Sequence, residues 1–199
     1  MANLDIDQII QQQDDYFQTG ATKNLQFRLD HLTILKNAIT QYEDAIIDAC
    51  SKDMGKPEQE SYQGEVVLSI SHINYMLKNL HRLMKPKKQK LPIGHYPGKA
   101  YTRAEPYGRS LIISPWNYPF QLAMVPLVGA IAAGNCAVVK PSEISANVSN
   151  VIKQMIEEYF NPEYLTVRFG KDWKKSYASC ICTSDAACSG IRRQKFMHC

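Results

Sequence analysis

The sequence predicts an α/β protein in which N-terminal helices precede a partial parallel sheet. Residues 4–84 place apolar side chains at steps of three and four residues, which is typical of amphipathic helices. From residue 99 onward, short apolar runs alternate with helical stretches in the order strand, helix, strand, helix, strand. This order favours parallel strands joined by right-handed crossovers, so the second half of the chain is expected to carry the sheet.

Three helices are expected before the sheet. The first covers about residues 4–17, and the second covers about residues 24–54 and ends at Gly55. The third covers about residues 57–84, with its apolar side chains on one face. The lysine-rich stretch KPKKQKLPIGHYPGKA then favours an exposed loop, and a basic arm for nucleic acid is the alternative.

Residues 99–114 are expected to form a hairpin followed by a buried strand, with the turn at 106–108. The next segment, 119–134, is apolar nearly all round and predicts a buried helix. A short strand at 136–140 and an amphipathic helix at 145–160 follow, and YLTV would start a further strand.

Composition indicates an ordinary globular protein. Hydrophobic residues make up 45% and charged residues 21% of the 199 residues. No apolar run approaches the roughly 18 residues of a membrane span. The N-terminus MANLDIDQII has acidic residues where a secretion signal has basic ones, so a cytoplasmic location is expected.

The net charge of +4 is distributed unevenly. Residues 168–199 contain seven Lys/Arg and two Asp/Glu. Residues 1–167 contain sixteen Lys/Arg and seventeen Asp/Glu. The body therefore gives no reason to expect a nucleic-acid partner. Four of the six cysteines crowd into the tail, at positions 180, 182, 188 and 199, but their spacing fits no common zinc motif. Cys136 lies in an apolar run and is expected in the core.

Two polar loops follow predicted parallel strands and could share one ligand crevice. One loop is 114–118, and the other, 140–143, follows the next strand. Lys140 and Glu143 could hold the hydroxyls of a ribose, or Glu143 could simply cap the following helix. Asn117 could donate to a developing oxyanion, or it could be only a turn residue. The GxGxxG dinucleotide fingerprint is absent.

The stretch LIISPWNYPFQLAMVPLVGAIAAGNCAVVKPSE, residues 111–143, resembles the cofactor-domain core of the aldehyde dehydrogenase superfamily. Its beginning, LIISPWNYPF, is most similar to the class 3, or fatty-aldehyde, branch. The resemblance includes EPYGR and DMGKP upstream and covers about residues 1–167. It implies an incomplete Rossmann-like cofactor domain, with residues 1–167 as the N-terminal part of an NAD(P)-binding domain.

The resemblance implies a role for the residues of both loops. Asn117 would supply the oxyanion-hole amide, and Tyr118 would line the substrate side. Glu143 favours NAD over NADP, because a carboxylate accepts a bond from the 2′-hydroxyl and repels a 2′-phosphate. The reaction would oxidise an aldehyde to a carboxylic acid through a cysteine thiolate, and full-length relatives would form homo-oligomers. The residues expected to hold the cofactor are Ile113, Ser114, Pro115, Trp116, Lys140, Ser142 and Glu143.

The chain departs from the family pattern in its last part. It contains neither the Gly-Gln-x-Cys context of the nucleophile nor the Glu-Leu-Gly-Gly context of the general base. Residues 168–199 do not resemble the family as written, but a +1 frame of codons for 175–199 can encode KVMHPASAHLTPLVLELGGKSSCIV, which does. We therefore expect a frame-shifted, disordered tail and a chain that is inactive alone. The alternative is a non-catalytic remnant that binds nucleotide weakly or associates with an intact relative.

Overall fold

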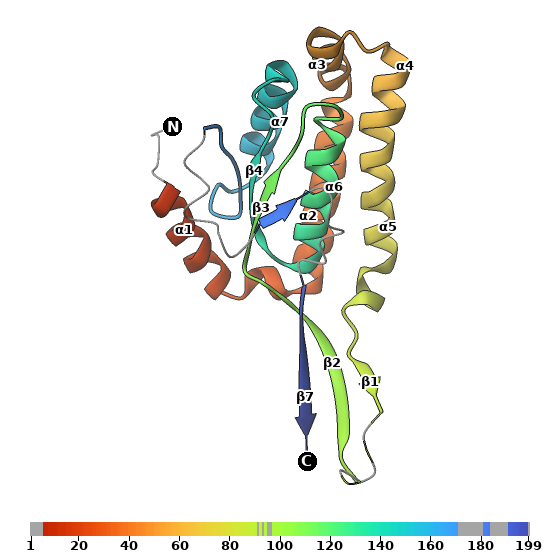
Figure 1. Ribbon diagram of the computed structural model, residues 1–199, viewed down its shortest axis with the longest axis vertical. Helices are drawn as coiled ribbons and strands as arrows, with labels where there is room; N and C mark the ends of the chain where they lie inside the picture. Colours follow the sequence, from red (N-terminus) through yellow and green to blue (C-terminus); the bar gives the residue numbers. More distant parts are fainter. Residues whose placement is uncertain are drawn as a thin grey trace.

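The structure is a computed structural model and describes residues 6–90, 92, 94 and 97–170, together with the backbones of 181–183 and 191–198. It consists of a layered α/β body and a narrow antiparallel arm that projects from the body (Figure 1). The predicted fold class is confirmed, because helices come first and a parallel sheet follows.

The N-terminal half is helical, as predicted, but it is divided more often than the sequence pattern indicated. The expected helix over 24–54 breaks at Tyr42, whose backbone has φ −94° and ψ 8°. Glu43 and Asp44 then open a new helix, since acidic side chains stabilise a helix N-terminus. The elements are α1 (Ile6–Gln18), η1 (Ala21–Lys23), α2 (Leu25–Gln41), α3 (Glu43–Met54), α4 (Glu58–Ser61), the π-helical η2 (Tyr62–Val67) and α5 (Leu68–Leu83).

A parallel sheet forms the centre of the body. α6 (Gln121–Ala133) connects its strands β3 and β4, and α7 (Ala146–Tyr159) connects β4 and β5. The register places Ile113 opposite Lys140, so β3 and β4 end side by side. The predicted strand–helix–strand–helix–strand run is thus confirmed. The strands lie in the order β5-β4-β3-β6, and they are β3 (Arg109–Ile113), β4 (Cys136–Lys140), β5 (Leu165–Val167) and β6 (Ile181–Thr183).

The arm is an antiparallel sheet of β1 (Lys87–Gln89), β2 (Lys99–Pro106) and β7 (Ile191–His198), in the order β1-β2-β7. The hairpin predicted within 99–114 is wrong, because β2 pairs with β1 and β7. The buried strand predicted after it is present as β3, which joins the parallel sheet. Gly108, at φ 108°, lies between β2 and β3 and permits the change of direction. β1 lies within the lysine-rich segment that was expected to be a loop.

Two segments of the tail have strand backbones. β6 pairs in parallel with β3, and β7 pairs antiparallel with β2. Disorder of the tail as a whole stays a prediction. Residues 171–180 and 184–190 lie outside the described residues, as do the side chains of the four tail cysteines. The domain boundary at residue 167 stays a prediction.

The sheet separates two packing regions of unequal size. Ile112 and Val139 belong to the larger core, in which α2, α5, α6 and α7 pack together (Figure 1). Leu111 and Val138, with the opposite alternation, cluster with Ile9 of α1 on the other face. α6 is largely buried, as its uniformly apolar sequence predicted. In the described part of the chain, no helix is long and apolar enough to cross a membrane.

Candidate functional site

The two predicted loops lie next to each other at the carboxyl end of the parallel sheet. The backbone amide of Ser114 donates to the carbonyl oxygen of Lys140 over 3.1 Å, which ties the start of one loop to the start of the other. This contact follows from the register, because Ile113 and Lys140 are the last paired residues of β3 and β4. The structure therefore brings together the loops that the sequence assigned to one crevice.

Lys140 and Glu143 form an ion pair, with 3.4 Å between Nζ and Oε1. The Lys140 side chain is 14% exposed and that of Glu143 is 50% exposed, so the cation is set back while the carboxylate faces solvent. Glu143 Oε1 also accepts from the backbone amide of Gly170 over 3.2 Å. A donor and an acceptor thus lie side by side, which is the arrangement that neighbouring hydroxyl groups of a ligand require.

The alternative role for Glu143, as the cap of the following helix, is filled by another residue. The Asp53 carboxylate, at the end of α3, accepts from the backbone amides of Asn147 over 3.1 Å and Val148 over 2.9 Å. These amides belong to the first turn of α7, where donors lack partners within the helix. The position of Glu143 is therefore not explained by helix capping.

Ser142 and Ser114 shape the crevice in different ways. The Ser142 hydroxyl accepts a hydrogen bond from the backbone amide of Ile144 over 3.3 Å. The backbone carbonyl of Ser142 accepts one from the Ser149 hydroxyl over 2.7 Å. Both bonds hold the turn that contains Ser142. Ser114 is buried, and its hydroxyl has no hydrogen-bond partner among the described residues. A polar group of a ligand would relieve the cost of burying that hydroxyl.

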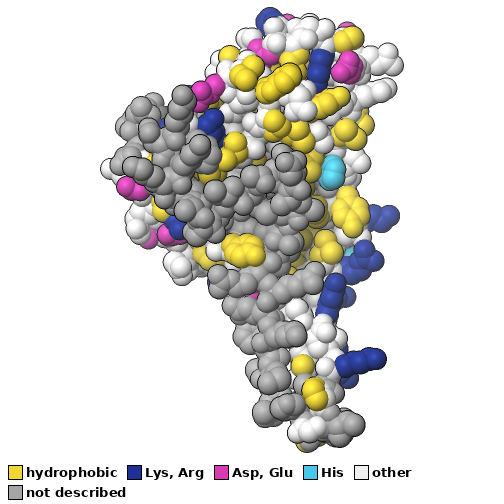
Figure 2. Space-filling view, in the orientation of Figure 1, with side chains coloured by type: hydrophobic (Ala, Val, Ile, Leu, Met, Phe, Trp, Pro, Cys, Tyr) yellow, Lys and Arg dark blue, Asp and Glu magenta, His cyan; other side chains and the backbone are white. Residues whose placement is uncertain are grey.

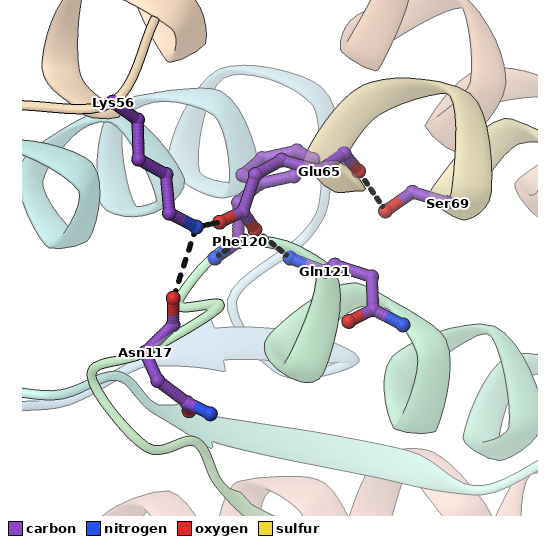
Figure 3. A network of polar contacts seen from close by, with 6 residues as sticks. All are labelled: Lys56, Glu65, Ser69, Asn117, Phe120 and Gln121. Carbon is purple, nitrogen blue, oxygen red and sulfur yellow. Dashed lines mark hydrogen bonds and ion pairs between the residues drawn. The ribbon is translucent and has the colours of Figure 1, made fainter. Parts of the chain in front are cut away.

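The exposed part of the first loop consists of Trp116, Asn117 and Tyr118, between a half-buried Pro115 and a buried Pro119. Trp116 is 56% exposed and Tyr118 is 39% exposed. The backbone carbonyl of Asn117 and its side-chain amide point in different directions (Figure 3). The loop therefore presents an amide flanked by two aromatic rings, which suits contact with a ligand.

A fully buried carboxylate, Glu65 of η2, holds this loop in place, and it was missed in the sequence (Figure 3). Its Oε2 accepts from the backbone amides of Phe120 over 3.2 Å and Gln121 over 2.8 Å, at the start of α6. Its Oε1 accepts from Lys56 Nζ over 2.9 Å. The same ammonium donates to the carbonyl oxygen of Asn117 over 2.9 Å, so the ion pair is linked to the loop.

Lys56 and Gly64 also position the ring of Tyr118. The Lys56 Nζ atom lies 3.8 Å from the ring centroid, within cation–π range. A Cβ on Gly64 would lie 3.3 Å from Tyr118 Cε1, so a larger residue there would crowd the ring. Lys56 belongs to DMGKP, which carries part of the family resemblance, whereas nothing around Glu65 distinguishes it from a surface acid on a predicted helix.

The two cysteines with described side chains are unsuited to nucleophilic catalysis. Cys50 and Cys136 are both buried, and the prediction for Cys136 is thereby confirmed. Burial raises the pKa of each thiol to about 12, so the reactive thiolate is scarce near neutral pH. Across the described residues, no group of three or more His, Cys, Asp or Glu side chains could hold a metal ion.

A mostly apolar pocket opens beside Lys140. It lies between α1, β3, β4 and the residues that follow β5, and it is lined by Ile6, Ile9, Leu111, Val138, Arg168 and Phe169. Lys140 lines this pocket and also pairs with Glu143. A ligand held by the ion pair therefore has an apolar surface within reach.

Comparison with known proteins gives a consistent assignment. A sequence profile described as the aldehyde dehydrogenase family matches residues 1–184. The chain is similar to 4,4'-diaponeurosporen-aldehyde dehydrogenase of Staphylococcus aureus, with 44% identity over 152 residues, or 76% of this chain and 33% of the relative. It is also similar to aldehyde dehydrogenase family 3 member B3 of Mus musculus, with 38% identity over 161 residues, or 81% of this chain and 34% of the relative. The chain thus spans about a third of the length of these curated relatives.

Solved structures agree with this assignment. The substrate-bound state of Staphylococcus aureus AldH matches with a TM-score of 0.83 and 40% identity, over 88% of this chain and 38% of that one. Succinic semialdehyde dehydrogenase from Streptococcus pyogenes, in complex with NADP+, matches with a TM-score of 0.75 and 20% identity. The match covers 91% of this chain and 40% of that one. The second likeness concerns the fold alone. Together with the profile and the curated relatives, the first confirms the resemblance and shows that the chain belongs to the aldehyde dehydrogenase family.

Proposed function

We propose that this chain provides the cofactor-binding loops of an NAD(P)-dependent aldehyde dehydrogenase. The observation that carries the proposal is the Lys140–Glu143 ion pair beside loop 114–118, at the carboxyl ends of neighbouring parallel strands. Ligands of open parallel sheets bind at such ends. Because Asp53 caps α7, the place of Glu143 calls for another explanation, and ligand binding supplies one.

The ion pair suits the hydroxyl groups of a ribose. Lys140 can donate through its ammonium and Glu143 can accept through its carboxylate, while the pocket beside Lys140 offers an apolar surface for an aromatic base. We propose NAD rather than NADP, because the Glu143 carboxylate repels a 2′-phosphate. The remaining residues of the proposed cofactor cleft are Ile113, Ser114, Pro115, Trp116 and Ser142.

Asn117 is proposed to act on the aldehyde. Its side-chain amide can donate to the oxygen that gains negative charge when a nucleophile adds to the carbonyl carbon. Lys56 engages the backbone carbonyl of Asn117, and the side-chain amide points elsewhere (Figure 3). Tyr118 is proposed to line the substrate side of the loop. The bound cofactor would accept the hydride from the aldehyde carbon, and water would then supply the second oxygen of the carboxylic acid product.

We further propose that these 199 residues alone do not oxidise aldehydes. Burial raises the pKa of Cys50 and Cys136 to about 12, which disfavours either thiol as the nucleophile. The sequence contains neither the nucleophile context nor the general-base context that the family resemblance calls for. These residues are then a nucleotide-binding unit, and the catalytic nucleophile and general base would have to come from outside them.

Calorimetric titration with NAD+ tests the cofactor assignment. The wild-type chain is expected to bind, and Lys140→Ala and Glu143→Gln should each weaken binding about tenfold, since a hydrogen bond to a charged group contributes roughly 1.5 kcal/mol. Lys153→Ala is the matched control, because Lys153 in α7 also pairs with a glutamate, and it should bind like the wild type. Unchanged affinity in both site variants would refute the assignment.

A separate assay tests whether the chain alone oxidises aldehydes. Aldehyde-dependent NADH formation, followed by absorbance, should not exceed the background without protein. Robust turnover that Asn117→Ala abolishes would overturn this part of the proposal.

A further inference from the structure

The turn between α3 and α4, residues 53–56, is linked to both loops of the candidate site. Asp53 lies in the last turn of α3, and Lys56 lies just before α4. Between them, Gly55 has a φ of 67°, and its backbone amide donates to the carbonyl oxygen of Ser51 over 2.8 Å. This left-handed residue changes the direction of the chain, so two side chains three positions apart reach different parts of the molecule.

Asp53 is linked to the 140–143 loop through α7. Its carboxylate accepts from the backbone amides of Asn147 over 3.1 Å and Val148 over 2.9 Å, and from the side-chain amide of Asn147 over 2.6 Å. In the same turn of α7, the Ser149 hydroxyl donates to the carbonyl oxygen of Ser142 over 2.7 Å. The contact between α3 and α7 therefore also sets the place of the loop that carries the ion pair.

Lys56 is linked directly to the 114–118 loop. Its ammonium donates to the carbonyl oxygen of Asn117 over 2.9 Å (Figure 3), and it lies 3.8 Å from the centroid of the Tyr118 ring. The Lys56 side chain is only 12% exposed, and the Glu65 carboxylate accepts from it over 2.9 Å. The ammonium is thus held on several sides, and the loop is held against it.

The two loops also contact each other, so these links close into a ring. The Ser114 amide donates to the carbonyl oxygen of Lys140 over 3.1 Å. The ring runs from the 53–56 turn through α7 and the 140–143 loop to Ser114, and then along the 114–118 loop and Lys56 back to the turn. Packed side chains and hydrogen bonds transmit displacements between distant sites. A change on the Asn117 side is therefore expected to reach the 140–143 loop.

Ordinary structural roles explain only part of this turn. A carboxylate in the last turn of a helix opposes the helix dipole, so Asp53 does not stabilise α3. Ser145, at the N-cap of α7, makes no side-chain capping bond, so the first turn of α7 depends on a residue from α3. A counter-charge for Glu65 explains the burial of Lys56, but it does not require the second bond to Asn117.

We propose that Asp53 and Lys56 are positioning residues that set the distance between the ribose-binding ion pair and the Asn117 amide. This inference rests on the proposed function, in which the ion pair holds the cofactor and the amide receives the carbonyl oxygen. The cofactor and the aldehyde must meet within contact distance, and a misplacement of about 1 Å can lower the rate about a hundredfold. A turn bound to both loops keeps the two holding points at a fixed separation.

Calorimetric titration with NAD+ tests whether the turn acts on the nucleotide site. Asp53→Asn replaces one of the two accepting carboxylate oxygens with a donor, and Lys56→Gln gives a shorter, uncharged side chain. Each variant is expected to bind NAD+ about threefold more weakly or worse, since each loses at least one hydrogen bond of the ring. The result for Lys56→Gln carries the most information, because Lys56 contacts the Asn117 side and not the ion pair.

The Lys140→Ala background separates positioning from a general loss of stability. If the turn acts through the ion pair, Asp53→Asn and Lys56→Gln should change NAD+ affinity by less than about 1.5-fold once Lys140 is absent, because linked residues do not act additively. A loss of about threefold that persists in this background would overturn the proposal.

The matched controls are Asp48→Asn and Lys52→Gln, which make the same chemical changes in an ion pair of α3 outside the ring. The two side chains are 61% and 59% exposed, so both variants should bind NAD+ within about 1.5-fold of the wild-type affinity. Circular dichroism and thermal midpoints show which variants fold, and Asp53→Asn provides the test if Lys56→Gln does not. Equal losses of affinity in the controls and in the turn variants would refute the positioning role.

Hydrogen exchange at the Ser114 amide tests the ring without a nucleotide. Nuclear magnetic resonance should show exchange at least about threefold faster in Asp53→Asn, because loosening of α7 weakens the bond to the Lys140 carbonyl. Asp48→Asn should exchange at the wild-type rate. An unchanged rate in folded Asp53→Asn would overturn the proposal. A wild-type chain that does not bind NAD+ would refute the proposed function, and the exchange rates would still decide whether the turn joins the two loops.

Discussion

At the scale of single residues, one buried carboxylate organises the candidate site. Glu65 accepts hydrogen bonds from Lys56 and from the backbone amides of Phe120 and Gln121. A buried charge is tolerated when it is paired and fully hydrogen-bonded, and Glu65 meets both conditions. Through Lys56 it also fixes the carbonyl oxygen of Asn117, so the loop geometry depends on a residue outside the loop.

Glu65→Gln is expected to lower the free energy of unfolding by about 3 kcal/mol or more, because it leaves the Lys56 ammonium partly buried without a counter-charge. Glu163→Gln is the matched control at an exposed glutamate, and it should change the free energy by less than about 0.5 kcal/mol. Denaturant unfolding followed by circular dichroism measures both. Equal stability of the two variants would show that the buried pair contributes little.

Asn117, Lys140 and Glu143 could be chosen from the sequence because each lies at or just after the end of a recognisable strand. The structure then brings their two loops together through the bond between Ser114 and Lys140. Glu65 offered no such signal, since an acid on an amphipathic helix is normally a surface residue. The candidate residues named from the sequence are therefore those marked by local chain direction, whereas Glu65, which holds the loop, is marked only by its burial.

At the scale of elements, α6 is held at both ends by the N-terminal helices. Glu65 accepts hydrogen bonds from the backbone amides at the start of α6. Arg28 donates over 3.1 Å to the carbonyl of Ala132, near the end of α6. Gly134 then ends the helix with φ 85°. Because α6 begins directly after the Asn117 loop, the helix position and the loop geometry are set together.

Gly134→Ala is expected to lower the free energy of unfolding by about 2 kcal/mol or more, since a close contact adds to the cost of a positive φ. The new Cβ would lie 2.6 Å from Arg28 Nη2 and 2.7 Å from the Thr22 carbonyl oxygen. Gly55→Ala is the matched control, because Gly55 has φ 67° and no atom lies within 4 Å of the added Cβ. This variant is expected to lose only about 1 kcal/mol of the free energy of unfolding. Thermal unfolding measures both, and a larger loss for Gly55→Ala would contradict the packing argument.

The strand–helix order and the burial of α6 could be predicted because each rests on the spacing of neighbouring side chains. The pairing of β2 could not be predicted in the same way. A turn signal at 106–108 shows where the chain changes direction, but it does not show which strands then pair. The structure places β2 beside β1 and β7 and places β3 in the parallel sheet.

At the scale of the whole molecule, charge is separated along the chain. Residues 1–65 contain twelve Asp/Glu and five Lys/Arg, whereas residues 66–104 contain only basic charges. The net charge of +4 hides this separation.

The tail is predicted to come from a shifted reading frame. Sequencing of the gene through codons 160–200 and beyond should show, in the +1 frame after residue 167, a family sequence that includes a Glu-Leu-Gly-Gly context. The acid-poor, cysteine-rich composition of residues 168–199 supports this expectation. A +1 frame without that context would contradict the prediction and leave residue 167 without significance as a boundary.

Sequence patterns were sufficient for the fold class, the strand–helix order and the two loops at strand ends, because periodicity, glycine and proline act on neighbouring residues. The folded chain was needed to show what holds those loops. Glu65 accepts from an amide 55 residues away, and Asp53 caps a helix at a residue 94 positions later. Such contacts join distant segments through the packing of the whole core, which no local spacing of residues can specify.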